Sequence, residues 1–435
     1  MQELPAAPES AKPHLARSQL WRGTSWLGIR LLWLALCSTF LTAEAKPEEP
    51  PLDFPPNLPV IFLQAEKTIN GQEKTPCAIS LLCPAESKTC TTNTLTGVVK
   101  IHGASSQGYP KKSFGVTLDA PAKLLDLRQD KHWILNAAYV DRSLMRHKLS
   151  YDLFRSLSKP NSPRRAVASR FVEVFVNGSY NGAYLLMERV DGNLLGLQPF
   201  HSNDVNHACI YKAVDHSANF AQPGHPGYEQ REPDPLIKAF WTPLDRLDRF
   251  VSTATEEDFF GAEKGISVRV DLDNAIDFHL LVLLTSNMDG FDKNFIIARD
   301  VAKTNAPIPK FFFVPWDYDA TFGRSWNAAK VEPSLWLSNH LLNRLEKSPE
   351  YRARFSARWK QLRDNQFSVK TIHGMIDQSA ATLGDAVKRN AKKWPTTQGG
   401  YPDSLTFEQD IAEMKAWIVH RTQWLDQEIA RRQHP

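Results

Sequence analysis

The sequence predicts an α+β fold, with a β-rich N-terminal part and a helical C-terminal part. Between residues 60 and 188, short apolar runs rich in β-favouring side chains are separated by turn residues. Beyond residue 333, apolar residues recur at helical spacing to the end of the chain. With 435 residues, 42% of them hydrophobic, the chain can bury a sizeable core as one large domain or two intimate ones.

The first half supplies most of the predicted strands. Four short apolar runs are followed by a hairpin whose turn carries two Asn-Gly pairs. Between the runs and the hairpin, Leu144, Leu149, Leu153 and Leu157 have helical spacing, and Asp141 is a candidate cap. The predicted strands are 60–63, 98–102, 113–118 and 133–135, with the hairpin over 171–176 and 183–188.

The second half is predicted to be mainly helical. Residues 199–235 are polar and irregular, and a helix is expected over 273–284. Residues 310–317 form an apolar run that predicts a buried strand. The last helix carries an apolar face made of Ile411, Met414, Trp417, Ile418, Trp424, Leu425 and Ile429.

Composition excludes several classes of protein. The amounts of Gly (21) and Pro (29) and the lack of repeats exclude collagen, coiled coil and wholesale disorder. No apolar run reaches about 18 residues, which excludes a polytopic membrane protein. The net charge of +4 is too weak and dispersed to indicate nucleic-acid binding, so no nucleic-acid partner is expected.

The N-terminus has the pattern of an export signal. Basic residues within 1–30 precede the apolar stretch Leu31–Leu41, and the small-x-small pattern Ala43-Glu44-Ala45 follows. This order predicts a signal peptide over residues 1–45, with an uncleaved anchor as the alternative. Residues 46–57 are Pro-rich and read as an extended linker. The mature chain is therefore expected to be secreted, periplasmic or at the cell surface, without a membrane span.

Four cysteines remain after the predicted signal peptide. Cys77, Cys83 and Cys90 lie within fourteen residues in a polar stretch, and Cys209 lies far along the chain. In an exported protein this pattern favours one or two disulfides that pin a loop, and the three ways of pairing stay open. The absence of any CxxC argues against zinc.

Two acidic motifs are the first candidates for chemistry. Asp289 is followed five positions later by Asn294, the spacing of the protein-kinase catalytic loop. In that loop the Asp orients the substrate hydroxyl or accepts its proton, and the Asn holds a metal. Asp317 and Asp319 end the predicted strand and would point the same way, roughly 6–7 Å apart. Paired carboxylates suit a Mg²⁺ ion that bridges nucleotide phosphates.

A small polar loop is the second candidate. Gly103-Ala-Ser-Ser-Gln-Gly108 joins two predicted strands, and Lys111 and Lys112 follow it. Backbone amides and the hydroxyls of Ser105 and Ser106 can cradle phosphates, while a lysine neutralises them. It is not a Walker A motif, because no Lys follows the second Gly and a strand comes next.

These residues carry a resemblance to the spore-coat protein H (CotH) kinase family, which are atypical protein kinases. It runs from about residue 58 to 430 in the family's order, and its most specific parts lie near 289–294 and 315–323. The matching pieces are Gly103-Ala-Ser-Ser with Lys111-Lys-Ser-Phe114, Trp133-Ile-Leu-Asn136 with Asp141 and Arg146, Phe175-Val-Asn-Gly178 with Gly182-Ala-Tyr184 and Glu188, Asn287-Met-Asp289 with Lys293-Asn294, Pro315-Trp-Asp-Tyr-Asp319 with Phe322-Gly323, and Trp417-Ile418 with Arg421, Leu425 and Asp426.

The resemblance implies a degenerate protein-kinase-like domain over residues 58–430. Its β-rich lobe would span about 58–195, with an added cysteine-bearing segment at 74–93, and its helical lobe about 196–430. ATP would bind between the lobes with Mg²⁺ or Mn²⁺.

The resemblance also implies roles for single residues. Lys111 or Lys112 would reach the phosphates, and Asp289 would be the catalytic-loop Asp. Metal ligands would be Asn294 and Asp317, with Asp319 sharing. Arg146 would meet a phosphate or a carboxylate, and Glu188 would lie near the hinge between the lobes.

The resemblance implies transfer of the ATP γ-phosphate to a Ser or Thr hydroxyl of an exported protein. Nucleotidylation or ligation on the same fold would use the same ATP-holding residues. A non-catalytic surface or assembly protein is a further alternative, although the intact acidic residues argue against it. A glycosidase is the weakest alternative, because the lysines and the small loop suit phosphate better than sugar.

Overall fold

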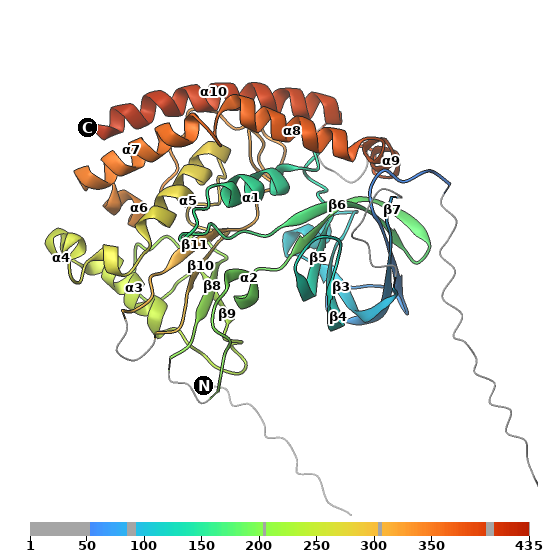
Figure 1. Ribbon diagram of the computed structural model, residues 1–435, viewed down its shortest axis with the longest axis horizontal. Helices are drawn as coiled ribbons and strands as arrows, with labels where there is room; N and C mark the ends of the chain where they lie inside the picture. Colours follow the sequence, from blue (N-terminus) through green and yellow to red (C-terminus); the bar gives the residue numbers. More distant parts are fainter. Residues whose placement is uncertain (1–52, 85–92, 203–205, 303–306, 397–403, 435) are drawn as a thin grey trace, which may run out of the picture. The chain divides into compact units, whose positions relative to one another are not determined.

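The computed structural model describes residues 53–84, 93–202, 206–302, 307–396 and 404–434. The predicted signal peptide and residues 46–52 of the predicted linker lie outside the described residues. The α+β prediction is confirmed, because strands dominate the N-terminal region and helices the C-terminal part (Figure 1). Among the described residues, no helix is long and apolar enough to cross a membrane.

Seven strands of the N-terminal region form a closed barrel in the order β1-β2-β3-β4-β5-β7-β6. Neighbouring strands are antiparallel except β1 and β6, which run parallel and close the barrel. Apolar side chains such as those of Ile61, Val99 and Val174 fill a buried cluster. The strands are β1 (Val60–Ala65), β2 (Thr75–Leu82), β3 (Leu95–His102), β4 (Ser113–Lys123), β5 (Gln129–Asn136), β6 (Ser169–Val176) and β7 (Ser179–Glu188).

The cysteine-bearing segment over 74–93 contains a strand of the barrel. Its first half is strand β2, which pairs with both β1 and β3 and alternates buried and more exposed residues. Cys77 is a buried free thiol on this strand and Cys209 is a second one, whereas Cys83 is disulfide-bonded. The expectation of two disulfides among these four cysteines is therefore wrong, and Cys90 lies outside the described residues.

A second sheet lies in the C-terminal part, with the order β11-β10-β8-β9. Its strands are β8 (Cys209–Ala213), β9 (Tyr228–Glu232), β10 (Phe295–Arg299) and β11 (Phe312–Pro315), and all its pairs are antiparallel. The prediction of an irregular segment over 199–235 missed β8 and β9. Both have only five residues, and β8 is buried along nearly its whole length, so it lacks the alternation that marks a strand.

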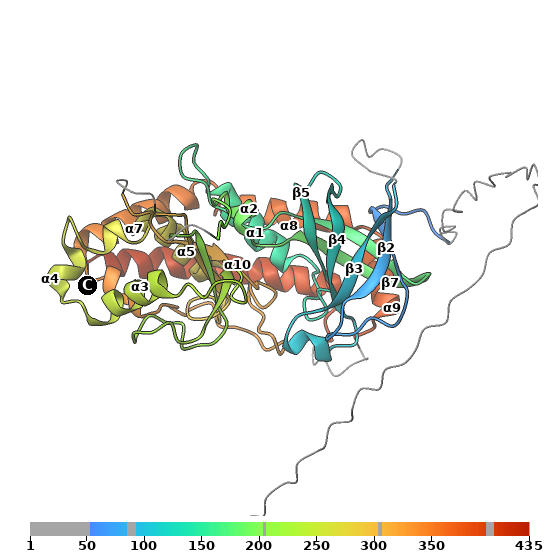
Figure 2. The same ribbon diagram turned by 90° about the horizontal axis from the view of Figure 1, so that it is seen from below.

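Three helices pack against α5, whose residues are almost all buried. A helix that is apolar on all sides is expected to lie inside the protein. It contacts α1, α7, α10 and β11, while α9 packs on β7 of the barrel (Figures 1 and 2). The helices are α1 (Arg146–Ser156), α2 (Gly192–Leu195), α3 (Thr242–Thr253), α4 (Glu256–Phe260), α5 (Leu272–Thr285), α6 (His340–Leu345), α7 (Pro349–Arg363), α8 (Val369–Leu383), α9 (Ala386–Lys393) and α10 (Phe407–Gln433), with short 3₁₀ turns at Ser105–Gly108 and Ile266–Val268.

Candidate active site

The first acidic loop leaves the second sheet directly after β11. The strand ends at Pro315, so Asp317 and Asp319 lie in a loop and not on the strand as predicted. Asp317 has φ of +61°, a left-handed conformation that few residues other than glycine adopt. Its backbone N–H donates to the Tyr151 hydroxyl at 3.0 Å, which fixes the turn. Such strained residues persist where the surroundings hold them, and they cluster at functional sites.

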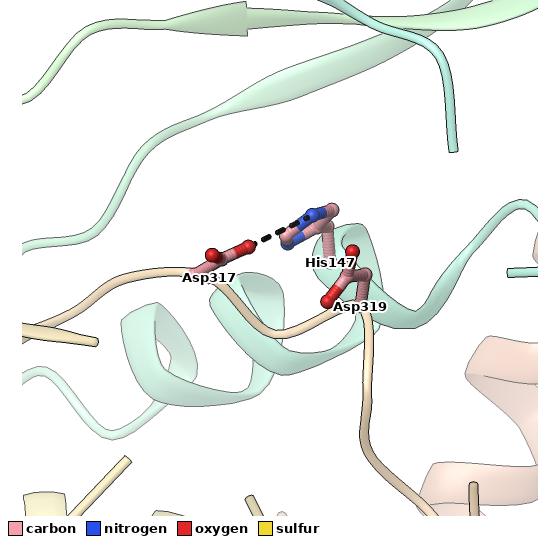
Figure 3. A group of neighbouring side chains, drawn as sticks. All are labelled: His147, Asp317 and Asp319. Carbon is pink, nitrogen blue, oxygen red and sulfur yellow. Dashed lines mark ion pairs between the residues drawn. The ribbon is translucent and has the colours of Figure 1, made fainter. Parts of the chain in front are cut away.

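Asp317, Asp319 and His147 form a compact group (Figure 3). One potential ligand atom from each side chain lies within 4.8 Å of the others, and His147 Nε2 is 3.8 Å from Asp317 Oδ1. Burial, followed by the negative charges of Asp317 and Asp141, raises the pKa of Asp319 well above its ordinary value. Two crowded carboxylates of this kind suit a bound divalent cation, which would reverse that repulsion.

The His147 ring directs an N–H group toward Asp317. Its Nδ1 accepts a hydrogen bond from the Tyr318 backbone N–H at 3.0 Å. The neutral ring therefore carries its proton on Nε2, the atom that faces Asp317. Oxygen ligands from the carboxylates fit a hard cation such as Mg²⁺ better than this protonated nitrogen does. Sequence reasoning missed His147, although it follows Arg146 of the matched motif directly.

The second acidic loop follows α5, where Ser286 ends the helix in a left-handed conformation. Asn294 also has a positive φ, of 54°. Its Nδ2 donates to Asp289 Oδ2 at 3.4 Å, and the Lys293 ammonium is 3.5 Å from the same oxygen. One carboxylate oxygen of Asp289 is thus held by its own loop. The structure brings Asp289 and Asn294 together as their spacing predicts.

Two hydrogen bonds join the acidic loops to each other. The Asn287 side chain donates to the Asp317 backbone oxygen at 3.2 Å. The Phe322 backbone N–H donates to the Thr285 oxygen at 2.7 Å. The two loops, about thirty residues apart along the chain, are therefore held next to each other.

The small loop at the barrel end forms a 3₁₀ turn over Ser105–Gly108. Ser105 is exposed and Ser106 is half-buried. The Lys112 ammonium donates to the Gln107 backbone oxygen at 2.7 Å, so it stays beside the loop. At the end of the loop, burial and then the charges of Asp319 and Asp317 raise the pKa of Tyr109. The loop end therefore lies within electrostatic range of the acidic carboxylates.

Lys111 occupies a different environment from Lys112. Its side chain is buried, and its ammonium donates to the backbone oxygens of Ala137 and Ala183 and to Asn390 Oδ1, at 2.7, 2.5 and 2.9 Å. It also lies over the Tyr184 ring, 4.5 Å from the centre. These contacts use all three N–H groups of the ammonium. The predicted phosphate contact of Lys111 stays a prediction that requires it to exchange one of them.

Arg146 belongs to a buried ion triad. Its guanidinium contacts Asp141 at 2.6 Å and Asp410 of α10 at 2.6 and 2.8 Å, and it donates to the Thr321 backbone oxygen at 2.9 Å. The side chains are at most 2% exposed. The sequence left open whether Arg146 meets a phosphate or a carboxylate, and the structure shows carboxylate partners. The triad ties the start of α1 to α10 and to the first acidic loop.

Removing Arg146 should destabilise the whole fold. Arg146→Met removes the nearest cation from two buried carboxylates and leaves Asp410 with the more distant Arg324, at 3.7 Å. Breaking a buried pair in this way costs about 3–5 kcal/mol. Urea unfolding should show a loss of that size. Arg155→Met, on the same helix in a partly exposed pair with Asp152, should cost less than about 1 kcal/mol. Equal small losses in both variants would contradict this account.

Glu188 lies at the end of β7 and is buried. Its carboxylate accepts a hydrogen bond from the Ala168 backbone N–H at 2.8 Å and lies 3.5 Å from the Arg128 guanidinium. These contacts support the strand end. Along the chain β7 is the last strand of the barrel, and the predicted place of Glu188 near a hinge between lobes stays a prediction.

Lys212 and His102 are two further residues of this region that the sequence did not reveal. Lys212 lies on β8 with its ammonium 5.3 Å from the centre of the Trp316 ring. Burial, and then the positive charges of Lys212 and Arg189, lowers the pKa of His102 to about 4, against the opposing effect of Asp317. Lys212 in the second sheet and His102 in the barrel therefore both lie within electrostatic range of Asp317.

Together these features define an α+β protein with a candidate metal site at His147, Asp317 and Asp319, next to a second acidic loop. Residues 99–425 match the family model of CotH kinase proteins, and the chain belongs to this family. It is 29% identical over 248 residues to the inner spore coat protein H of Bacillus subtilis (strain 168). That match covers 54% of this chain and 60% of the relative, so it spans less than two thirds of the relative's length.

Proposed function

We propose that the chain is an exported atypical protein kinase that transfers the ATP γ-phosphate to a Ser or Thr hydroxyl of a protein outside the cytoplasm. One observation carries this proposal. Along the chain, a buried helix is followed by the Asp289 loop, the hairpin of β10 and β11, and the Asp317 loop. A hydrogen bond from Asn287 joins the two loops. Protein kinases place a catalytic Asp and a metal-binding Asn in a loop that corresponds to the Asp289 loop, and a metal-binding Asp in a loop that corresponds to the Asp317 loop.

The other expectations belong to the same proposal. The family and its spore-coat relative support a kinase and an extracytoplasmic place. The proposal also includes a degenerate kinase-like fold, the signal peptide over 1–45, ATP, and Mg²⁺ or Mn²⁺. The acceptor is a protein, and nucleic acid has no part in the reaction. Nucleotidylation or ligation would use the same loops, and the products distinguish these reactions.

The residues divide the work of phosphoryl transfer between them. Asp317, Asp319 and Asn294 would hold the cation, which supplies charge neutralisation for the phosphates when bound. Lys212 and Lys112 lie near the carboxylates and the small loop, where they can neutralise further phosphate charge. Asp289 would receive the acceptor hydroxyl through its Oδ1, because Lys293 and Asn294 hold its other oxygen.

Nucleotide binding tests the assignment of the lysines. ATP with Mg²⁺ should raise the melting temperature by mass action on the native state. Lys212→Ala should weaken binding about 10- to 100-fold, because a hydrogen bond to a charged group contributes about 1.5–3 kcal/mol. Lys112→Ala should also reduce the shift, whereas Lys111→Ala should lower the melting temperature without nucleotide because two backbone oxygens lose their donor.

The exposed Lys370 of α8 provides the control, and Lys370→Ala should leave both quantities unchanged. A chain that gains no thermal stability at millimolar ATP and Mg²⁺ would contradict the kinase proposal and favour the non-catalytic alternative. If Lys212→Ala keeps the full thermal shift with ATP and Mg²⁺, Lys212 does not bind the phosphates. The phosphate-binding role then falls to Lys112 or Lys111.

A further inference from the structure

A small hairpin with an exposed tryptophan follows the first acidic loop directly. Arg324 pairs with Lys330 as in an antiparallel ladder, and the Val331 backbone N–H donates to the Gly323 oxygen at 3.0 Å. Trp326 lies at the tip between these pairs and is 63% exposed. Tryptophan is on average a largely buried residue. An open tryptophan this close to a candidate active site therefore indicates a contact with something outside the chain.

The tip of the hairpin is closed by its own hydrogen bonds. The Ser325 backbone N–H donates to the Ala329 oxygen at 2.9 Å, and the Ala328 N–H donates to the Ser325 oxygen at 2.9 Å. The Asn327 side-chain oxygen accepts from the Ala329 N–H at 3.1 Å. Hydrogen bonds thus hold the chain on both sides of Trp326. A side chain on such a support loses little freedom when it binds a partner.

The base of the hairpin is fixed to α10. Arg324 is buried, and its guanidinium donates to Glu413 at 2.8 Å and to the Ala328 backbone oxygen at 3.3 Å. The Trp417 indole N–H donates to the Val331 oxygen at 2.7 Å. The long helix therefore holds the hairpin at both of its ends, and Trp326 is presented by a rigid element.

The hairpin stands beside the acidic loops. Phe322, the residue before it, donates to the Thr285 oxygen at the end of α5. Ala328 packs in the same small apolar cluster as Tyr109, which lies within electrostatic range of Asp319. Trp326 is seven residues beyond Asp319, so about seven residues of an extended acceptor chain, at about 3.3 Å each, can span the separation. An acceptor segment whose hydroxyl reaches the site can therefore also reach Trp326.

The surroundings of Trp326 favour an apolar partner over a basic one. Arg324 and Lys330 both donate to the Glu413 carboxylate, at 2.8 and 3.3 Å, so this acid already serves two cations. In the second acidic loop, Met288 precedes Asp289 and is 39% exposed. Each acidic loop thus has a large apolar side chain exposed beside it.

We propose that Trp326 docks an apolar or aromatic side chain of the acceptor protein, a few residues away from the hydroxyl that receives the phosphate. This inference rests on the proposed kinase function and gives its acceptor a sequence feature. An indole ring offers a large, rigid contact area, and such aromatic anchors dominate binding at protein interfaces. The contact takes no part in the chemistry, so it should lower KM for the acceptor more than it changes kcat.

Peptide libraries test this inference with the full chain. Each peptide has one Ser at its centre, one flanking position is fixed in turn as Leu, Phe, Ala, Lys or Glu, and γ-labelled ATP with Mg²⁺ or Mn²⁺ is the donor. At one flanking position, Leu or Phe should raise kcat/KM over Ala by roughly 5- to 30-fold. Trp326→Ala should remove this preference through KM, and Trp326→Phe should keep part of it.

Leu236→Ala is the matched control, because Leu236 is 95% exposed in the connection after β9, at the opposite edge of the second sheet from β11. This variant should keep the preference. The thermal shift with ATP and Mg²⁺ should be the same in all variants, because Trp326 contacts the acceptor and not the nucleotide.

Three results would overturn the inference while leaving the kinase proposal intact. The first is the same selection in Trp326→Ala as in the unmodified chain, and the second is a preference for Lys over the apolar side chains. The third is a smaller thermal shift in Trp326→Ala, which would place the indole at the nucleotide. Transfer of γ-label neither to any peptide nor to the chain itself would overturn both proposals.

Discussion

Asp317→Asn is expected to abolish phosphoryl transfer, with turnover reduced by roughly 10³-fold or more. Asn is the informative substitution, because it tolerates the left-handed backbone at this position, where φ is +61°. The change removes one of two crowded carboxylates that together would hold the cation. The thermal shift produced by ATP with Mg²⁺ should shrink with it. Phosphate incorporation and thermal unfolding measure the two effects.

The unliganded protein provides the control for this variant. The charge of Asp317 helps to raise the pKa of Asp319, so the two carboxylates repel each other in the empty protein. Removing one charge should leave the melting temperature unchanged or raise it. Asp377→Asn, an exposed carboxylate of α8, should change neither activity nor binding. A variant that loses Asp317 yet keeps full transfer would contradict the role given to the first acidic loop.

Asp289→Asn should separate binding from turnover. The substitution is nearly isosteric, and the assigned role is to orient the acceptor hydroxyl and not to hold ATP. Turnover should fall by roughly 10²–10⁴-fold, the range for a positioned acid–base group. The thermal shift with ATP and Mg²⁺ should stay close to that of the unmodified chain.

The two variants together test the division of roles between the loops. The opposite pattern, with Asp289→Asn losing nucleotide affinity and Asp317→Asn remaining active, would reverse the assignment. Asp289 would then hold the cation, and Asp317 with Asp319 would be structural carboxylates after β11. Melting without ligand should be the same for Asp289→Asn and the unmodified chain, which excludes unfolding as the cause of lost turnover.

Much of the fold could be predicted from local patterns. Strands β1, β3, β4 and the hairpin of β6 and β7 follow alternation and turn residues, and α5 and α10 follow helical spacing. Strands β2 and β8 were not predicted, because their sequences lack a clear strand pattern. The first lies in a polar, cysteine-bearing context, and the second is a short run buried at nearly every position.

The site was predicted where its motifs are local and missed where its contacts are not. Asp289 and Asn294 are five residues apart in one loop, so their spacing revealed them. Lys212 stayed hidden because its strand was not predicted. The partner of Arg146 on α10 lies 264 residues away, and no local pattern indicates such a contact. The Lys111 ammonium donates all three of its hydrogen bonds, and one of the acceptors, Asn390 of α9, is likewise distant along the chain.

Incorporation of label from ATP into protein tests the central claim most directly. The full chain is incubated with Mg²⁺ or Mn²⁺ and ATP labelled at the γ-phosphate or, in parallel, at the α-phosphate, and modified residues are located by mass spectrometry. The account predicts metal-dependent γ-label on Ser or Thr hydroxyls, no α-label, and loss of incorporation in Asp317→Asn. Transfer of α-label, or γ-label that persists in Asp317→Asn, would contradict it.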